Sequence, residues 1–125
     1  MPKSAVEAWE WQPVVEPNRA TIPVMNDTKW NELRLAMDAM GDDSPHWWSL
    51  STNGYRYGPE GDWVHHFRAG DDYRNIVHID LHARNPAHRD ALRTELRKIK
   101  LPGIETERGF RIFGYVEPGQ FVDYI

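Results

Sequence analysis

Histidine and aspartate side chains gather in two short segments of the sequence, and these residue types can hold a metal ion. His65-His66 lies in one segment and His78-x-Asp80-x-His82 in the other. In a β-strand, residues two and four apart point to the same face, so the second segment would present three metal-capable side chains together. With His66 on a neighbouring strand, a His₃Asp site becomes geometrically possible. This pattern gives one candidate function, a small metal-dependent hydrolase using His66, His78, Asp80 and His82.

Two other interpretations of the same histidines stay open. The first is a solvated strand face that is rich in histidine, because no His-Glu-x-x-His helix motif accompanies the cluster. The second is a pH-sensitive or partner-facing patch, since histidine titrates near neutrality. Asp80, together with the loop residues Asp71 and Asp72, would also allow general base chemistry.

Nucleophiles and phosphate-binding loops have no recognisable context in this chain. No serine stands in a Gly-x-Ser-x-Gly turn. The segment Gly58-Pro59-Glu60-Gly61 is not followed by the Lys-Ser/Thr pair of a phosphate loop. The absence of cysteine removes thiol nucleophiles, zinc–thiolate sites and iron–sulfur clusters. The sequence therefore favours a protein that is not an enzyme and indicates no cofactor and no catalytic residue.

Aromatic residues flanked by acidic ones suggest a surface that binds another protein. Trp47 and Trp48 are neighbours, so in a strand only one of them can face the core. Aromatic anchors with a charged rim are typical of protein interfaces. We therefore predict that a partner contacts the following residues: Trp47, Trp48, Tyr55, Tyr57, Asp62, Asp71 and Asp72. The alternative is that these aromatic side chains complete the core, with the N-terminal segment covering them.

The overall charge also favours a protein partner over nucleic acid. The formal net charge is −4 over 125 residues, which argues against nucleic acid as the main partner because phosphate contacts need an electropositive face. Six basic residues are expected on or beside one helix, and we interpret them as a solvated face: Arg84, Arg89, Arg93, Arg97, Lys98 and Lys100. No signal peptide or membrane span is recognisable, so we expect a soluble protein of the cytoplasm with no membrane contact.

Hydrophobic periodicity predicts two helices. The first spans about residues 27–40, with the N-cap residue types at 26–28 and Gly41 just past its end. The second spans about residues 86–99, with Asn85 as N-cap and Pro86 at the first helical position.

Strand and turn signals fill the remainder of the chain. Strands are expected at 46–51, 55–57, 63–68 and 76–82, with turns at 53–54, 58–62 and 69–72. A last hairpin is expected over 104–116, and the apolar tail at 121–124 is compatible with one more short strand. The order α-β-β-β-β-α-β-β predicts an α+β fold: a mostly antiparallel sheet of about five to six strands with two helices packed on one face.

The N-terminal residues differ in composition from the rest. Four prolines within residues 1–24 forbid a long helix, so we expect this segment to be an arm that is partly extended or disordered. Residues 25–125 are expected to form a single α+β domain. Trp9 and Trp11 stand two residues apart, which suggests that the arm docks its tryptophans on the domain or on a partner.

Several local stretches resemble a known group of proteins. These are residues 26–37, Pro45-His46-Trp47, Asn53-Gly54-Tyr55 and residues 62–67. Across about residues 25–82 the chain resembles a family of small, uncharacterised bacterial proteins found among the immunity proteins of polymorphic toxin systems. The resemblance implies a cytosolic protein without cofactors that binds one cognate toxin and occludes its active site. We expect it to act as a monomer or weak homodimer, with its acidic surface raising the association rate.

Overall fold

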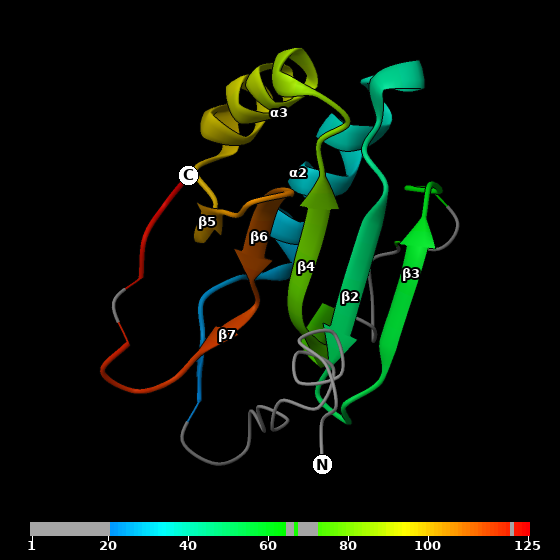
Figure 1. Ribbon diagram of the computed structural model, residues 1–125. Coiled ribbons are helices and arrows are strands. Elements are labelled where there is room, and N and C mark those ends of the chain that lie inside the picture. Colours follow the sequence, from blue (N-terminus) through cyan, green and yellow to red (C-terminus); the bar gives the residue numbers. More distant parts are fainter. Residues whose placement is uncertain (1–20, 65–66, 68–72, 121) are drawn as a thin grey trace, which may run out of the picture.

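Antiparallel strands form the frame of the protein in the computed structural model, which describes residues 21–64, 67, 73–120 and 122–125. The main sheet has five strands in the order β3 (Arg56–Glu60), β2 (Trp47–Ser51), β4 (Ile76–His82), β6 (Gly109–Phe113) and β5 (Gly103–Glu105) (Figure 1). A second, two-stranded sheet pairs β1 (Ile22–Pro23) with β7 (Tyr115–Val116). The expected α+β class with a mostly antiparallel sheet is confirmed.

Two helices cover one face of the main sheet: α2 (Asp27–Asp38) and α3 (Pro86–Ile99) (Figure 1). Asn85 caps α3 by accepting a hydrogen bond from the His88 amide, and Pro86 opens the helix as expected. α2 is capped by Asn26, and a short 3₁₀ turn, η1 (Gly41–Asp43), follows it. Neither helix is long and apolar enough to cross a membrane.

Aromatic rings fill the space between α2 and the sheet. Trp47 of β2 lies 5.2 Å from Phe67 and 5.8 Å from Trp63 between ring centroids, and Trp30 of α2 lies 6.0 Å from Phe67. Rings of this size bury about 150–250 Å² each, so a few of them supply much of the hydrophobic stabilisation. On the α3 side the core is aliphatic, with Leu92, Leu96 and Ile99 buried in the same cluster.

The segment after the first hairpin differs from the expectation. The turn at Asn53-Gly54 is present, but β3 continues to Glu60 through the expected turn at 58–62. Proline is tolerated there because β3 is an edge strand and its register with β2 shifts between Trp47 and Ser49. The strand expected at 63–68 is wrong for its described residues: Trp63, Val64 and Phe67 lie outside any strand. At this point side chains, in place of a neighbouring strand, accept hydrogen bonds from the backbone. Glu60 accepts from the Asp62 amide, and Asp62 accepts from the Val64 amide.

Each end of the described chain pairs with another segment: β1 pairs with β7, and the C-terminal tail pairs with the residue before β5. The last hairpin divides at Gly114, where β6 ends and β7 begins its pairing with β1. β1 lies within residues 1–24, the segment that we expected to be an arm, and residues 1–20 of that segment lie outside the described residues. Tyr124 forms an isolated bridge with Pro102, whereas Phe121 lies outside the described residues.

The close approach of β6 to β4 yields a stability test. A Cβ atom at Gly109 would lie 1.9 Å from the Leu81 carbonyl oxygen, so Gly109→Ala forces the two strands apart. We expect a loss of at least about 2 kcal/mol in the free energy of unfolding, measured by urea denaturation. Gly61→Ala is the control: its Cβ would meet only the flexible His46 side chain, at 3.2 Å. A Gly109 variant as stable as the control would contradict the described register.

Candidate functional site

The face of the main sheet opposite the helices, called the far face below, carries the histidine-rich side of β4. Strand register arranges its side chains in two cross-strand rows. One row contains Trp48, Asp80, Arg111 and Ile104, and the other contains Arg56, Leu50, His78 and Phe113. Because β4 alternates, Val77, Ile79 and Leu81 point to the core, and His78, Asp80 and His82 share the far face as expected.

Asp80 is held by a two-pronged ion pair with Arg111. The Nε of Arg111 lies 2.7 Å from Asp80 Oδ1, and its Nη2 lies 3.0 Å from Oδ2. Both side chains are mostly buried. Two parallel charge-assisted hydrogen bonds fix the geometry of a carboxylate. Each carboxylate oxygen of Asp80 thus accepts one hydrogen bond from Arg111.

His78 is buried and uncharged at neutral pH. Only 5% of its surface is exposed, and its Nε2 has no hydrogen-bond partner among the described residues. Burial lowers the pKa of His78 to about 4, with help from the positive charges of Arg111 and Arg56, while Asp80 opposes the shift. An imidazole in this state takes up no second proton near neutral pH and carries no charge.

His82 stacks against Trp48, the far-face member of the tryptophan pair. Their ring centroids lie 3.8 Å apart. Burial lowers the pKa of His82, and the positive charge of Arg108 lowers it further. The neutral imidazole therefore packs face to face against the Trp48 ring as an uncharged aromatic group.

The described residues provide no support for the metal hypothesis. Within residues 21–64, 67, 73–120 and 122–125, no three His, Asp or Glu side chains are grouped as a metal ion would require. Asp80 is paired with Arg111 and His82 is stacked on Trp48. The fourth expected ligand, His66, lies outside the described residues, so the four-residue site stays a hypothesis.

A second candidate surface lies at β3 and is called the tyrosine edge: Tyr55, Tyr57, Glu60 and Asp62. Tyr55 is 60% exposed, and Tyr57 is also exposed. The Tyr57 hydroxyl donates to Glu60 Oε1, and this hydrogen bond raises the pKa of Tyr57. The other oxygen of Glu60 accepts the Asp62 amide at 2.9 Å, and Asp62 Oδ1 accepts the Val64 amide at 2.7 Å. The loop after β3 is thus held by its own acidic side chains.

The expected partner-facing residues fall into separate groups. Trp47 is a core residue, which corrects the expectation that it contacts a partner: its ring packs on Trp63 and Phe67, and its Nε1 donates to the Asp62 carbonyl. Trp48 lies on the far face. Tyr55, Tyr57 and Asp62 come together at the tyrosine edge, whereas Asp71 and Asp72 lie outside the described residues.

One buried histidine was missed by the sequence analysis. His88 of α3 accepts a hydrogen bond from the Arg84 amide at Nδ1 (3.0 Å), and its Nε2 lies 2.7 Å from the Asp43 carbonyl oxygen. These partners assign the neutral tautomer with the proton on Nε2. His88 therefore ties the start of α3 to η1. Its position four residues before Leu92, on the line of the apolar stripe, was the available signal.

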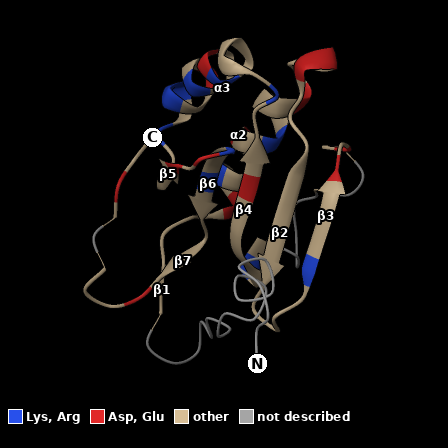
Figure 2. Ribbon diagram, in the orientation of Figure 1, with Lys and Arg blue, Asp and Glu red and all other residues tan. Residues whose placement is uncertain are grey.

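The basic face of α3 is largely neutralised by acidic neighbours (Figure 2). Arg93 pairs with Glu105 and Asp90 at 2.8 and 2.7 Å, Arg89 pairs with Glu105 at 3.2 Å, and Lys98 pairs with Glu95 at 3.0 Å. The two arginines lower the pKa of Glu105 to about 2. These pairs reduce the charge asymmetry that the sequence alone suggested.

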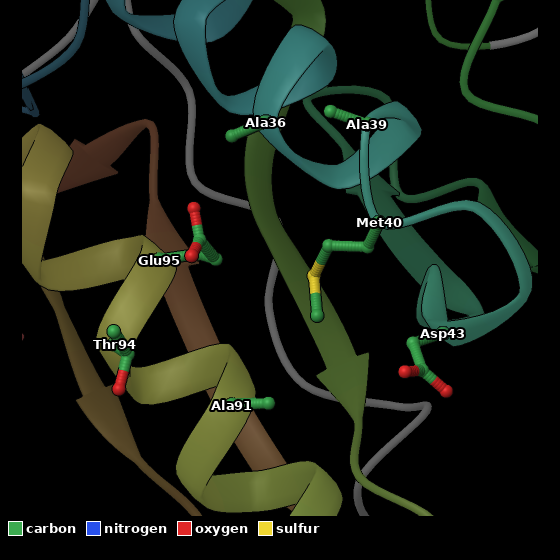
Figure 3. A pocket seen from close by; sticks show the side chains of 7 residues that line it. All are labelled: Ala36, Ala39, Met40, Asp43, Ala91, Thr94 and Glu95. Atoms are coloured by element: carbon green, nitrogen blue, oxygen red, sulfur yellow. The ribbon is translucent and has the colours of Figure 1, made fainter.

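A groove of about 420 Å³ runs between α2 and α3 on the side away from the sheet (Figure 3). Ala36, Ala39 and Ala91 line it, with Met40 and Glu95 at its walls. Glu95 already pairs with Lys98. The groove marks where small side chains leave space between the helices, and it holds no arrangement of acid, base and nucleophile.

The model of DUF6678, a family of unknown function, matches residues 14–119. The chain belongs to the DUF6678 family. No curated protein and no solved structure matches it. Membership in DUF6678 assigns no activity, so the function must be argued from the surfaces described above.

The buried His78 predicts a specific pH dependence. In the unfolded chain a histidine takes up its proton near pH 6.5, but in the folded protein it does so only near pH 4. The unfolded state therefore binds more protons in this window, so stability is full above pH 6.5 and falls as the pH is lowered toward 4. For this group alone the loss is about 3 kcal/mol.

The variant His78→Leu isolates that contribution. We expect its free energy of unfolding to fall less steeply between pH 6.5 and 4 than that of the unaltered protein, measured by urea denaturation at each pH. Identical slopes for the two proteins would show that His78 is not held neutral by its surroundings.

Proposed function

We propose that this DUF6678 protein is an immunity protein that binds a cognate bacterial protein toxin and occludes its active site. The observation that carries the proposal is the tyrosine edge, where two exposed tyrosines stand beside a loop fixed by acidic side chains. The sequence resemblance to immunity proteins supports the same function. In this proposal the protein acts in the bacterial cytoplasm, without a cofactor, as a monomer or weak homodimer.

The tyrosine edge has the properties of a binding anchor. Tyrosine supplies a large contact area with few rotatable bonds, so it loses little conformational entropy when it is buried. Tyr57 is already oriented by its hydrogen bond to Glu60 and by contact with Trp47, whose ring centroid lies 5.5 Å away. A surface that is ordered before binding pays less of the entropic cost of association.

Acidic groups near this edge favour a basic partner. Asp42 of η1 shortly precedes Pro45 and His46, and these two residues lie against the loop after β3: Trp63 Nε1 donates to the Pro45 carbonyl, and Gly61 adjoins His46. The neighbouring Asp43 is already paired with Arg84. Figure 2 shows acidic segments both at η1 and at the end of β3. Complementary charge accelerates the encounter of two proteins more than it tightens the final complex. We therefore expect the toxin to present a basic surface around its active site.

The metal-dependent hydrolase remains the alternative from sequence, and no described contact favours it. Elemental analysis of the purified protein separates the two functions. Zinc, manganese or iron bound near one equivalent would replace the immunity proposal with the hydrolase.

The central test uses the protein encoded by the neighbouring gene as the probe. Tyr55→Ala and Tyr57→Ala should each weaken binding to that protein by about 30-fold or more, which corresponds to the loss of an interface hot spot of about 2 kcal/mol. Tyr124→Ala is the matched control, because Tyr124 is equally exposed (63%) but lies beside β5 at the opposite edge of the sheet. Isothermal titration calorimetry gives the affinities.

Two results would contradict the proposal. The first is a neighbouring toxin that still kills its host when this protein is co-expressed. The second is binding that survives both tyrosine substitutions as well as it survives the Tyr124 control.

A further inference from the structure

His46 and His82 form a cross-strand pair on the far face, at the end of the sheet toward which the arrow of β4 points in Figure 1. Trp47 is opposite Leu81 in the register of β2 and β4, so the residue before the first is opposite the residue after the second. The His82 amide donates to the His46 carbonyl at 3.2 Å, which fixes the pair. Directly opposite residues of antiparallel strands have Cβ atoms about 4.5–5.5 Å apart. The two imidazoles therefore belong to neighbouring positions of one surface.

The ring nitrogens of this pair are available to a ligand. In the part of the chain that the structure describes, neither His46 nor His82 uses its ring nitrogens in a hydrogen bond or an ion pair. His82 contacts Trp48 through the face of its ring, whereas its nitrogens lie at the ring edge. His46 is exposed and His82 is half-buried. An ion in solution can therefore reach both side chains.

Glycines flank the pair on both sides, so no other side chain of this row fills the space around the two rings. Gly109 of β6 is opposite His82, and Gly61 lies next to His46. A Cβ atom at Gly61 would lie 3.2 Å from the His46 ring, which shows that this ring leans toward β3. Because the His46 side chain is exposed, a change between staggered rotamers can turn its ring toward His82.

Two uncharged imidazoles favour a transition metal as the ligand. Burial and the positive charge of Arg108 lower the pKa of His82, so its imidazole is unprotonated near neutral pH, the form that binds metals. Imidazole nitrogen suits Zn²⁺, Cu²⁺ and Ni²⁺, whereas Mg²⁺ and Ca²⁺ prefer oxygen ligands. No third His, Asp or Glu side chain among the described residues joins the pair. Water would therefore complete the coordination of a bound ion.

We propose that His46 and His82 together bind one divalent transition metal ion at this end of the far face. The site shares only His82 with the four-residue site predicted from the sequence. An ion with two protein ligands exchanges readily, so we expect it to leave during gel filtration and not to affect the elemental analysis of the purified protein. The proposal does not depend on the immunity function.

Isothermal titration calorimetry of the untagged full chain with Ni²⁺ tests the site, and Mg²⁺ is the control ion. We expect Ni²⁺ to bind and Mg²⁺ to give no heat of binding. Loss of an outer-shell partner of a metal ligand already costs about 10–100-fold in affinity, so removal of a ligand should weaken Ni²⁺ binding by at least about tenfold. The two variants are His46→Ala and His82→Phe, the second of which keeps an aromatic ring against Trp48 without its nitrogens.

Other histidines of the chain provide matched controls. His78→Leu, and a variant that combines His65→Ala with His66→Ala, should bind Ni²⁺ as tightly as the unaltered chain does. Urea denaturation shows whether each variant is folded, and His46→Ala, at an exposed position, decides the test if His82→Phe is not. No Ni²⁺ binding by the unaltered chain would overturn the proposal. Binding that survives the site substitutions, or that is lost only in the variant at positions 65 and 66, would overturn it as well.

Discussion

The alternation of β4 is the constraint on which the rest of the structure depends. Val77, Ile79 and Leu81 lie on one side of this central strand and are buried against the helices. The intervening residues must then point the other way, because side chains of a strand alternate. Burying three aliphatic side chains therefore places His78, Asp80 and His82 on the far face.

Burial or a neighbouring side chain determines the state of each of these three polar side chains. His78 stays neutral through burial, Asp80 is bound by Arg111, and His82 stacks on Trp48. Asp80 and His82 are engaged with neighbouring side chains, whereas His78 is buried without a hydrogen-bond partner for its Nε2 among the described residues. The three residues that the sequence suggested as metal ligands thus form part of the far face of the sheet. The tyrosine edge lies elsewhere, at the edge strand β3.

The sequence predicted the elements whose signals are local. α3 and β4 begin and end where expected, since a capping asparagine, a proline and an apolar stripe define the helix and strict alternation defines the strand. The sequence predicted that this strand would end at residue 57, because proline normally ends a strand. β3 continues to Glu60 because it is an edge strand whose register shift with β2 accommodates Pro59. β1 and β7 have two residues each, which is too short for any periodicity to show.

The candidate surfaces were harder to predict because they depend on register between distant strands. Asp80 was identified, but its partner Arg111 is 31 residues away and meets it only through the pairing of β4 with β6. Trp47 and Trp48 were correctly expected to face opposite sides, yet only the fold shows that Trp47 is the core member. The exposure of Tyr55 and Tyr57 could be predicted because both lie next to a hairpin turn, and turns lie at surfaces.

Hydrogen–deuterium exchange of the protein alone and in the presence of the protein encoded by the neighbouring gene tests the central claim most directly. If the tyrosine edge is the partner surface, amide exchange slows across residues 55–64 on binding, while β5 at the opposite edge exchanges as before. Slowed exchange at Gly103–Glu105 with no change over residues 55–64 would contradict the account.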